Sequence, residues 1–564
     1  MTDVHAALTG PGALFEIGDE DVRGTTMPVF RNRPRSLPEL LQASSRFGDR
    51  TYVIDGDQRL SFAGHLRMAL TLARVLRDRY AVRPGDRVAI FAANRWDWVL
   101  TFWAIAAAGA IPAPMNGWWT AEEYRHAQRL VDPVLLIGDQ PRLGRLNASD
   151  RACPVLALDE AAELARPGDG PPGEPARSAT GTAEDDPALL LFTSGTTGRP
   201  KAVTLSHRSL IGFVQMSALL EAEAMVAAGL PVPEAAGELP PGQDVALVTA
   251  PLFHVSTLQG NVILALLRGS STVLLPGRFD PERVLATIER ERVTSWSALG
   301  SAGPRVASSP AIGRYDTASV YRIGVGGAPV SPAVQQGLRA AFPSARALGM
   351  GYTSTEGGAV IARIGGPEYA AHPTATGRVT PTTQVEIRNG AGEPVPEGED
   401  GEVHVRSPYI MLGYWNDPEA SAAVLKGDGW LAMGDIATIA DGLLYINARA
   451  RDMILVSAEN VSPTEVEYVL EEHPDVGEAA VLAVDDDVTG DAVCAVVVPA
   501  PGARPARERL AQWCGQHLAP YKVPTRWYFT PEPLPRTASG KLVKRALRDW
   551  IDAGHPDPTP ERSA

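Results

Sequence analysis

A stretch of ten residues, from Phe192 to Lys201, constrains this chain more than any other part of its sequence. It follows the apolar run 188–191 and reads Phe-Thr-Ser-Gly-Thr-Thr-Gly-Arg-Pro-Lys. A buried strand that leads into glycines and small hydroxyls suits phosphate, because glycine lets the backbone approach a ligand and successive N–H groups then face the anion. The spacing is not that of a Walker A loop. A flexible linker is the alternative, but it would need neither the strand nor the final Pro-Lys pair. The predicted phosphate ligands are Thr193, Ser194, Gly195, Thr196, Thr197, Gly198 and Lys201.

Length, charge and cysteine content narrow the class of protein. The 564 residues exceed a single core, and a chain of this length suggests roughly three to four domain-sized units. A formal net charge of −14 disfavours nucleic acid or an anionic membrane as partner. The three cysteines are widely spaced and give neither a disulfide framework nor a metal-ligand pattern. Without a basic and apolar leader at the N-terminus, we expect a cytoplasmic protein.

The most apolar stretch, residues 99–115, has the length of a marginal membrane span. Gly109, Pro112 and Pro114 interrupt it, so a buried helix followed by a buried strand is the favoured interpretation and no membrane span is expected.

Alternating patterns predict an α/β fold. Amphipathic segments separate short apolar runs, which is typical of α/β layers with largely parallel sheets. The predicted strands are 87–91, 134–137, 245–248, 271–275 and 320–324, and the predicted helices are 61–78 and 281–292. Two Pro/Gly-rich stretches, 166–187 and 230–243, are predicted to be loops.

The pattern changes twice towards the C-terminus. Short strands with Gly, Pro and Asp turns predict a small β-barrel-like unit over 377–445. Ser462 followed by Pro463 and Glu465 has the signature of a helix start. Strands over 479–484 and 492–498 and a helix over 506–517 complete a compact α+β module. The predicted organisation is an N-terminal domain, 1–450, with α/β subdomains to about 376, and a C-terminal domain, 451–564.

Further segments carry residues suited to a nucleotide. Gly324–Pro329 precedes Gly351–Glu356, where Tyr352 can stack on adenine and Thr355 can donate to phosphate. Glu356 supplies oxygen ligands of the kind that Mg²⁺ prefers. Asp435 can accept two hydroxyls at once, because a carboxylate only accepts; the alternative is a turn aspartate.

Lys541 closes the stretch Leu-Pro-Arg-Thr-Ala-Ser-Gly-Lys near the C-terminus. A lysine is a cation at neutral pH, and on a glycine turn it can enter a site and neutralise developing charge.

In this order the motifs resemble those of the adenylate-forming superfamily, which includes acyl-CoA synthetases, firefly luciferase and peptide-synthetase adenylation domains. The chain resembles most the AMP-dependent carboxylate–CoA ligases of the actinobacterial fatty-acid type. The resemblance implies that Lys541, Thr355 and Glu356 act in catalysis and that Glu356 and Thr196 serve Mg²⁺. It implies that adenine and ribose contact Gly327, Ala328, Pro329, Gly351, Tyr352, Asp435 and Arg449.

The same resemblance suggests an acyl pocket, a hinge and a CoA tunnel. His254 lies in a Pro-Leu-Phe-His-Val segment that borders the acyl pocket in the family, although simple packing is an equal alternative. Thr353, also assigned to the acyl pocket, replaces a glycine of the family motif, and its β-branched side chain would narrow the groove or place a hydroxyl in it. A Gly-Ser-Ala segment replaces Pro-Thr-Met. The remaining assignments are Ser301 and Ala302 at the acyl pocket, Arg451 at the hinge, and Ser457 and Ala458 at the CoA tunnel.

The expected reaction joins a carboxylic acid to CoA. ATP and the acid give an acyl adenylate and pyrophosphate, and CoA then displaces AMP after the C-terminal domain turns. An adenylating enzyme with another acceptor is the main alternative: a carrier-protein thiol, an amine, or nitrite in an ATP-dependent diazotase. A nucleotide-binding protein without turnover and a serine hydrolase have less support, the latter because Gly-x-Ser-x-Gly is absent. The sequence determines neither the identity of the acid nor whether the protein forms a homodimer.

Overall fold

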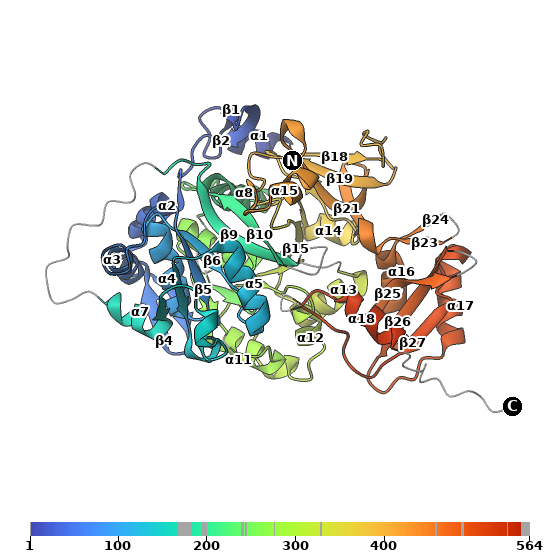
Figure 1. Ribbon diagram of the computed structural model, residues 1–564. Coiled ribbons are helices and arrows are strands. Elements are labelled where there is room, and N and C mark those ends of the chain that lie inside the picture. Colours follow the sequence, from blue (N-terminus) through green and yellow to red (C-terminus); the bar gives the residue numbers. More distant parts are fainter. Residues whose placement is uncertain are drawn as a thin grey trace.

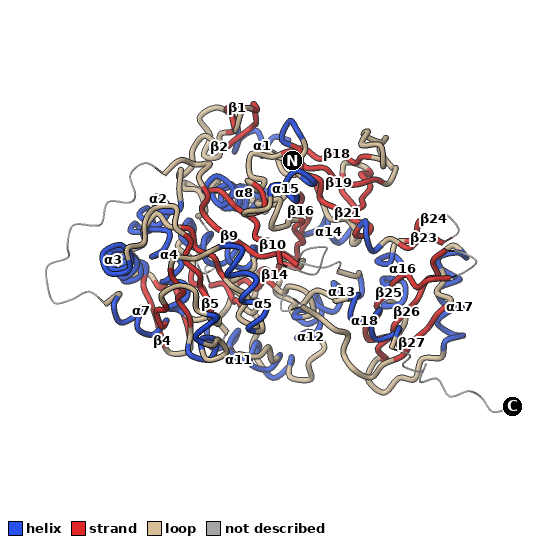
Figure 2. The backbone as a smooth tube through the Cα atoms, viewed as in Figure 1, coloured by secondary structure: helices blue, strands red, loops and turns tan. Residues whose placement is uncertain are grey.

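The computed structural model describes residues 2–166, 182–194, 200–238, 242, 245–275, 277–326, 330–456, 459–486, 490–537 and 540–553. Layered sheets and helices form a large N-terminal part, and strands β23–β27 belong to a smaller C-terminal part (Figure 1). Strands alternate with helices through the larger part (Figure 2). The predicted mixed α/β class with a small C-terminal α+β domain is confirmed.

Helices flank the sheets and contribute side chains to the core. They are α1 (Thr2–Thr9), α2 (Leu37–Ala43), α3 (Phe62–Tyr80), α4 (Trp96–Ala107), α5 (Ala121–Val131), α6 (Gln140–Leu143), α7 (Leu158–Leu164), α8 (His207–Ala227), α9 (Val255–Thr257), α10 (Leu264–Arg268), α11 (Pro281–Glu291), α12 (Ala302–Ala307), α13 (Pro332–Ala341), α14 (Gly366–Ala371), α15 (Pro418–Val424), α16 (Pro463–Glu471), α17 (Arg507–His517) and α18 (Lys544–Asp552).

A parallel sheet of order β6-β5-β7-β8 forms the first layer. Its strands are β5 (Arg87–Phe91), β6 (Ile111–Pro114), β7 (Leu135–Gly138) and β8 (Val155–Ala157). The apolar stretch 99–115 comprises most of α4 followed by β6, with Gly109 turning the chain at a φ of 78°. The predicted buried helix and strand are therefore confirmed.

A nine-stranded sheet, ordered β17-β16-β15-β14-β13-β11-β12-β3-β4, is the largest layer. Its strands are β3 (Thr51–Asp55), β4 (Gln58–Ser61), β11 (Val245–Val248), β12 (Ser271–Leu274), β13 (Ser295–Ser297), β14 (Arg322–Val325), β15 (Ala347–Tyr352), β16 (Ala362–Gly365) and β17 (Arg378–Val379). The centre is parallel, as predicted. The edges are antiparallel: the β3–β4 and β15–β16 connections contain no helix, and β16 returns to β17 through the short helix α14.

Smaller antiparallel sheets surround these layers. They contain β1 (Ile17–Val22) and β2 (Thr25–Phe30); β9 (Pro187–Ser194), β10 (Pro200–Ser206) and β20 (Gly413–Tyr414); and β18 (Gln384–Arg388), β19 (Gly401–Arg406), β21 (Trp430–Ala440) and β22 (Leu443–Arg449). The predicted β unit over 377–445 thus has a four-stranded sheet of its own. It is also tied to its neighbours, because β17 joins the nine-stranded sheet and β20 pairs with β10.

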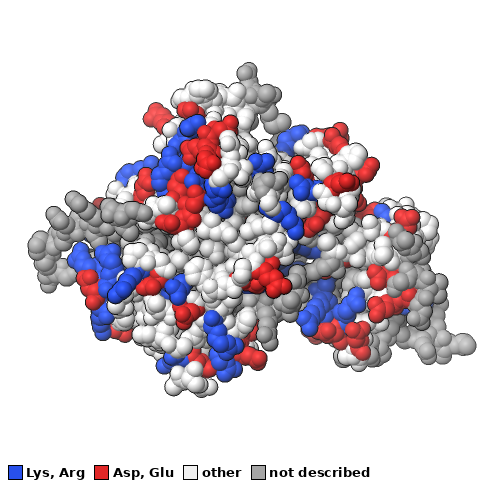
Figure 3. Space-filling view, turned by 45° about the horizontal axis from the view of Figure 1, so that its top comes forward, with Lys and Arg blue, Asp and Glu red and all other residues white. Residues whose placement is uncertain are grey.

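By length and composition alone, helix α8 is long and apolar enough to cross a membrane. In the sequence, a different stretch, 99–115, has the length of a marginal membrane span. Most of α8 is buried within the protein, as in a core helix. On the face shown in Figure 3, acidic and basic side chains are interspersed.

The C-terminal part is a sheet flanked by α16, α17 and α18. Its strands are β23 (Ile454–Val456), β24 (Glu459–Val461), β25 (Val476–Asp486), β26 (Gly490–Pro499) and β27 (Arg526–Phe529). The Ser462 side chain accepts a hydrogen bond from the Glu465 backbone at 3.3 Å, so the predicted start of α16 is confirmed. The buried residues Val466 and Leu470 anchor this helix to the sheet.

Candidate active site

Lys201, Tyr414 and Glu356 form a connected group beside the phosphate loop. Lys201 lies opposite Thr193 in the β9–β10 pair, and its ammonium lies 4.7 Å from the centre of the Tyr414 ring. The Tyr414 hydroxyl in turn donates to Glu356 Oε1 at 3.2 Å. A cation over an aromatic face is attracted by the ring's electron density. Gly195, Thr196, Thr197, Gly198 and the Ser194 side chain lie outside the described residues.

Tyr352, Asp435 and Arg449 meet at one point, although they come from three strands. The Tyr352 hydroxyl donates to Asp435 Oδ2 at 2.5 Å. Arg449, which faces Asp435 across the β21–β22 pair, places its Nε 2.8 Å from Oδ1. All three are predicted from their motifs to contact adenine and ribose, and the structure brings them together.

Burial shapes the protonation of this group. Asp435 is 3% exposed, and burial raises the pKa of its carboxyl against the opposing charge of Arg449. Burial and the neighbouring Asp435 charge hold the pKa of the Tyr352 phenol well above its usual value. Tyr352 therefore stays a neutral donor, and the ionised form of Asp435 depends on Arg449.

The turn after β15 carries Thr355 and Glu356. The Glu356 carbonyl accepts a hydrogen bond from the Met411 backbone at 2.8 Å, which fixes the turn against the segment that leads to β20. Thr353 donates its hydroxyl to the Ala359 carbonyl at 2.8 Å. This hydrogen bond holds the 353–359 turn together. Gly351 lies in β15, whereas Gly327, Ala328 and Pro329 lie outside the described residues.

The loop that carries Lys541 docks on the N-terminal part. A Cβ on Gly300 would lie 2.9 Å from the backbone of Gly540, so the two chains touch at this point. Arg536 donates to the Gly540 carbonyl at 3.0 Å and to Glu478 at 3.0 Å. The Thr537 amide donates to the Lys541 carbonyl at 2.7 Å, which closes the turn that carries the lysine.

Lys541 and His254 share the same region. Burial, together with the positive charge of Lys541, lowers the pKa of His254 to about 4. His254 Nε2 is buried and has no hydrogen-bond partner within the described part of the chain. His254 is therefore neutral near pH 7 and offers an unused ring nitrogen close to the docked lysine.

Further contacts hold the two parts together around α16. Glu471 forms a hydrogen bond with Ser331, the residue that caps α13, and burial raises the pKa of its carboxyl to about 7. Tyr468 on the same helix bonds the Val330 backbone. Ser462 donates to the Asn447 carbonyl. Arg451 lies in the short 3-10 turn Ala450–Asp452 between the two parts; its side chain, Ser457 and Ala458 lie outside the described residues.

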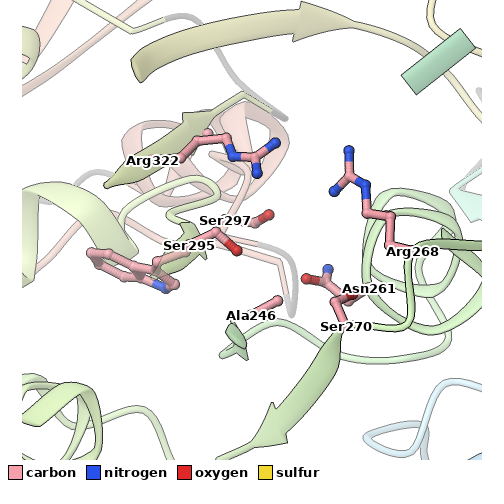
Figure 4. A pocket seen from close by; sticks show the side chains of 10 residues that line it. Ala246, Asn261, Arg268, Ser270, Ser295, Ser297 and Arg322 are labelled. Carbon is pink, nitrogen blue, oxygen red and sulfur yellow. The ribbon is translucent and has the colours of Figure 1, made fainter. Parts of the chain in front are cut away.

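A cavity of about 90 Å³ lies beside the nine-stranded sheet, between β11, β13 and β14 and the segment that includes α10 (Figure 4). Its lining residues were not predicted: Ala246, Gly260, Asn261, Arg268, Ser270, Ser295, Trp296, Ser297, Arg322 and Gly324. The predicted acyl-pocket residues lie elsewhere. Ser301 adjoins Gly540, and Ala302 packs against the cluster that contains Trp296.

Comparison with known proteins identifies the family. The model for the AMP-binding enzyme family matches residues 40–415, and the model for its C-terminal domain matches residues 465–541. Feruloyl-CoA synthase of an Amycolatopsis species is 36% identical over 88% of this chain and 95% of its own length.

Solved structures agree with this assignment. An amide bond synthetase of Marinactinospora thermotolerans superposes with a TM-score of 0.78 at 32% identity, over 91% of this chain and 99% of its own. An o-succinylbenzoate CoA synthetase of Bacillus subtilis, solved with its acyl-adenylate intermediate, superposes with a TM-score of 0.72 at 26% identity, over 90% and 98%. The chain therefore belongs to the AMP-binding enzyme family, and it is an AMP-forming acid–thiol ligase on the acyl-CoA synthetase branch of the adenylate-forming superfamily.

Proposed function

We propose that this enzyme activates a carboxylic acid as an acyl adenylate at the site between Lys541, His254 and Asp435, and then transfers the acyl group to CoA. The docking of Gly540 against Gly300 is the observation that carries the proposal, because it brings the lysine of a separate domain to the nucleotide residues. The electrostatic effect of Lys541 on both His254 and Asp435 supports the same placement.

In the first step a carboxylate oxygen of the acid attacks the α-phosphorus of ATP. A new phosphorus–oxygen bond forms, the bond between the α-phosphorus and the bridging oxygen breaks, and pyrophosphate leaves. Negative charge accumulates on the α-phosphoryl oxygens in the transition state. Lys541 is positioned to oppose that charge, and a preorganised cation in a water-poor site contributes strongly to such a step. The neutral His254 adds a hydrogen bond without competing for the anion.

Asp435 and Tyr352 are arranged for the nucleoside. A carboxylate offers about four acceptor positions, and Tyr352 and Arg449 each use one in this structure. The remaining positions suit the two ribose hydroxyls. Because its hydroxyl is held by Asp435, the Tyr352 ring has a fixed orientation for stacking on adenine.

Glu356 is the described residue that fits a magnesium ion. Mg²⁺ is usually bound through one or two carboxylates together with substrate phosphates, rather than by a cage of side chains. Within the described ranges there is no group of three or more His, Cys, Asp or Glu side chains that could hold a metal by themselves. A magnesium ion held here by Glu356 and the ATP phosphates would neutralise phosphate charge.

The second step requires a thiol to reach the acyl carbon. The thiolate of CoA attacks that carbon, a carbon–sulfur bond forms, and AMP leaves with the former carboxylate oxygen. The Lys541 loop is docked against Gly300 in the present arrangement, so we propose that the C-terminal domain turns about the 450–452 segment between the steps. Arg451 lies within that segment.

The test is ATP–pyrophosphate exchange across a panel of aryl, fatty and polycyclic acids, followed by product mass spectrometry with CoA. We expect acid-dependent exchange and an acyl-CoA product. Parallel reactions with amines, a phosphopantetheinyl carrier protein and nitrite test the other acceptors. If exchange occurs without an acyl-CoA product, and one of these acceptors gives a product, then that acceptor and not CoA takes the acyl group. The proposed adenylation step would be unaffected.

A further inference from the structure

The cavity beside the nine-stranded sheet has a polar lining of unusual composition. Side chains from both walls point into it, with the guanidinium groups of Arg322 and Arg268 facing the same space from β14 and α10 (Figure 4). Ser295, Ser297, Ser270 and Asn261 supply hydroxyls and an amide. The volume of about 90 Å³ accommodates one compact functional group or a few water molecules.

The sheet leads from this cavity towards the reaction site. Successive residues of a strand point to opposite faces. On one face, Trp296, Ile323 and Leu348 pack in a hydrophobic cluster with α11 and α13. On the other face, the positions of β13, β14 and β15 beyond Arg322 towards their C-terminal ends are small: Ser297, Gly324, Gly349 and Gly351, with Gly326 directly after β14.

The length of this small-residue face is suited to an elongated acid. Arg322 begins β14, and Gly326 follows its end, next to Gly300 and thus to the docked Lys541 loop. Four residues of strand span about 13 Å at roughly 3.3 Å per residue. An acid with its reacting carboxylate near Lys541 could therefore extend along the sheet and end at the arginines.

The charges around the cavity favour a second anion. Glu221 on α8 contacts both arginines, at 2.6 Å to Arg322. Arg363 on β16 also interacts with Glu221 and Arg322, whereas Glu223 pairs with His5 at 2.7 Å. Three guanidiniums thus face two carboxylates, one of which has another partner.

Two further observations show that the arginines are not fully satisfied. The Nε atoms of Arg268 and Arg322 are buried without a hydrogen-bond partner among the residues that the structure describes. Burial and the neighbouring guanidiniums, against the effect of Glu221, lower the pKa of Arg268 to about 10, so it remains charged near pH 7.

We propose that this cavity binds the far end of the acid and that Arg268 and Arg322 recognise a second carboxylate there, so that the preferred substrate is an elongated dicarboxylic acid. The inference rests on the proposed adenylation activity and specifies its substrate class. Charge-assisted, bidentate contacts to a carboxylate are the interaction for which arginine is best suited. The alternative is a purely structural ion cluster that fastens α8 and α10 to the sheet.

The experiment compares matched acids in ATP–pyrophosphate exchange. Each dicarboxylic acid is compared with two partners of the same length: the monocarboxylic acid, and the acid whose far carboxyl is replaced by an amide. Straight-chain and aryl series are both used. We expect kcat/KM to be at least tenfold higher for a dicarboxylic acid of optimal length than for either partner. Equal use of the three, or preference for the monoacid or the amide, would overturn the inference.

Variants separate recognition from structural support. Arg322→Gln and Arg268→Gln should raise KM for the dicarboxylic acid at least tenfold more than KM for the monoacid. Arg322→Lys should retain part of the preference, and Arg290→Gln, an exposed position on α11, serves as the control. Equal losses for both acids would indicate the structural role and contradict the inference.

Two measurements keep the test valid if a variant unfolds: direct binding of the acid, and the ranking of acids by the wild-type enzyme. Calorimetry should show binding of the dicarboxylic acid to wild type and weaker binding to a folded variant. If neither glutamine variant folds, the ranking of acids by the wild-type enzyme decides the question alone. If only monoacids support exchange, the inferred preference for a dicarboxylic acid is refuted, but the proposed adenylation activity is retained. If no acid supports exchange, the proposed function itself is refuted.

Discussion

The Tyr352 hydroxyl donates a 2.5 Å hydrogen bond to the carboxylate of Asp435, which lies in a different sheet and 83 positions later in the chain. This bond joins the residue that is suited to stack on adenine with the residue that is suited to accept from ribose. Arg449 completes the group from the strand beside Asp435. The nucleoside contacts are therefore prepared before ATP binds.

Asp435→Ala should weaken ATP binding by at least about a hundredfold. Hydrogen bonds to a charged group contribute roughly 1.5–3 kcal/mol each, and the variant would lose those to ribose. Tyr352→Phe, which keeps the ring, should change the dissociation constant only a few-fold. Isothermal calorimetry with ATP measures both. Glu399→Ala, an exposed position in the same β unit, is the control, and an unchanged constant for Asp435→Ala would exclude the ribose contact.

Tyr414 should affect ATP use through two separable contacts. Tyr414→Phe keeps the ring beneath Lys201 and loses the hydrogen bond to Glu356, so we expect a loss of up to about tenfold in kcat/KM for ATP. Tyr414→Leu also loses the cation–π contact, which should cost about a further two- to tenfold. If kcat/KM for ATP falls to the same extent in both variants, the ring has no role in holding Lys201.

Gly300→Ala should hinder the docking of the Lys541 loop. The residue has a φ of +56°, and an added Cβ would lie 2.9 Å from the Gly540 backbone. Adenylation should slow at least tenfold, whereas thioester formation from a presynthesised adenylate should slow much less. Gly313→Ala, where a Cβ meets nothing within 4 Å, is the control. Equal slowing of both steps would show that the effect is general destabilisation.

Glu471 should make adenylation depend on pH. Burial raises the pKa of its carboxyl to about 7 in the docked arrangement, where it bonds Ser331. The docked arrangement is therefore favoured when Glu471 is protonated, and it loses this contribution as pH rises from about 4.5 through about 7.

The matched variants for this prediction are Glu471→Gln and Glu472→Gln. The first should keep adenylation higher between pH 7 and pH 8 than wild type does, and the second, a neighbouring exposed carboxylate, should follow wild type. The exchange rate is measured from pH 6 to pH 8. A Glu471→Gln profile that coincides with that of wild type would remove Glu471 from the docking equilibrium.

Local patterns predicted those parts of the fold that local physics determines. Ser462, Pro463 and Glu465 predicted the start of α16, because a cap is made within one turn. The apolar runs predicted β5, β7 and β11 to within about a residue. The antiparallel edges of the nine-stranded sheet were missed, because strand direction depends on connections that no short pattern records.

The site, too, combines residues that local motifs predicted with residues that only the fold brings together. Tyr352, Asp435 and Arg449 were predicted together through their motifs. Tyr414 was missed because only the pairing of β10 with β20, far apart in the sequence, places it beside Lys201. The alternation of serine and glycine with large residues in β13 and β14 was a usable signal for the cavity, but the helix that supplies Arg268 could not be paired with it from sequence alone.

The central claim, that Lys541 acts in adenylation and not in holding ATP, is tested most directly by Lys541→Ala with two measurements on one preparation. With an acid that the wild-type enzyme accepts, the variant should lose ATP–pyrophosphate exchange by at least a hundredfold, and its dissociation constant for ATP by calorimetry should stay within about threefold of wild type. Near-normal exchange in Lys541→Ala, or a loss of exchange explained fully by weaker ATP binding, would contradict the account.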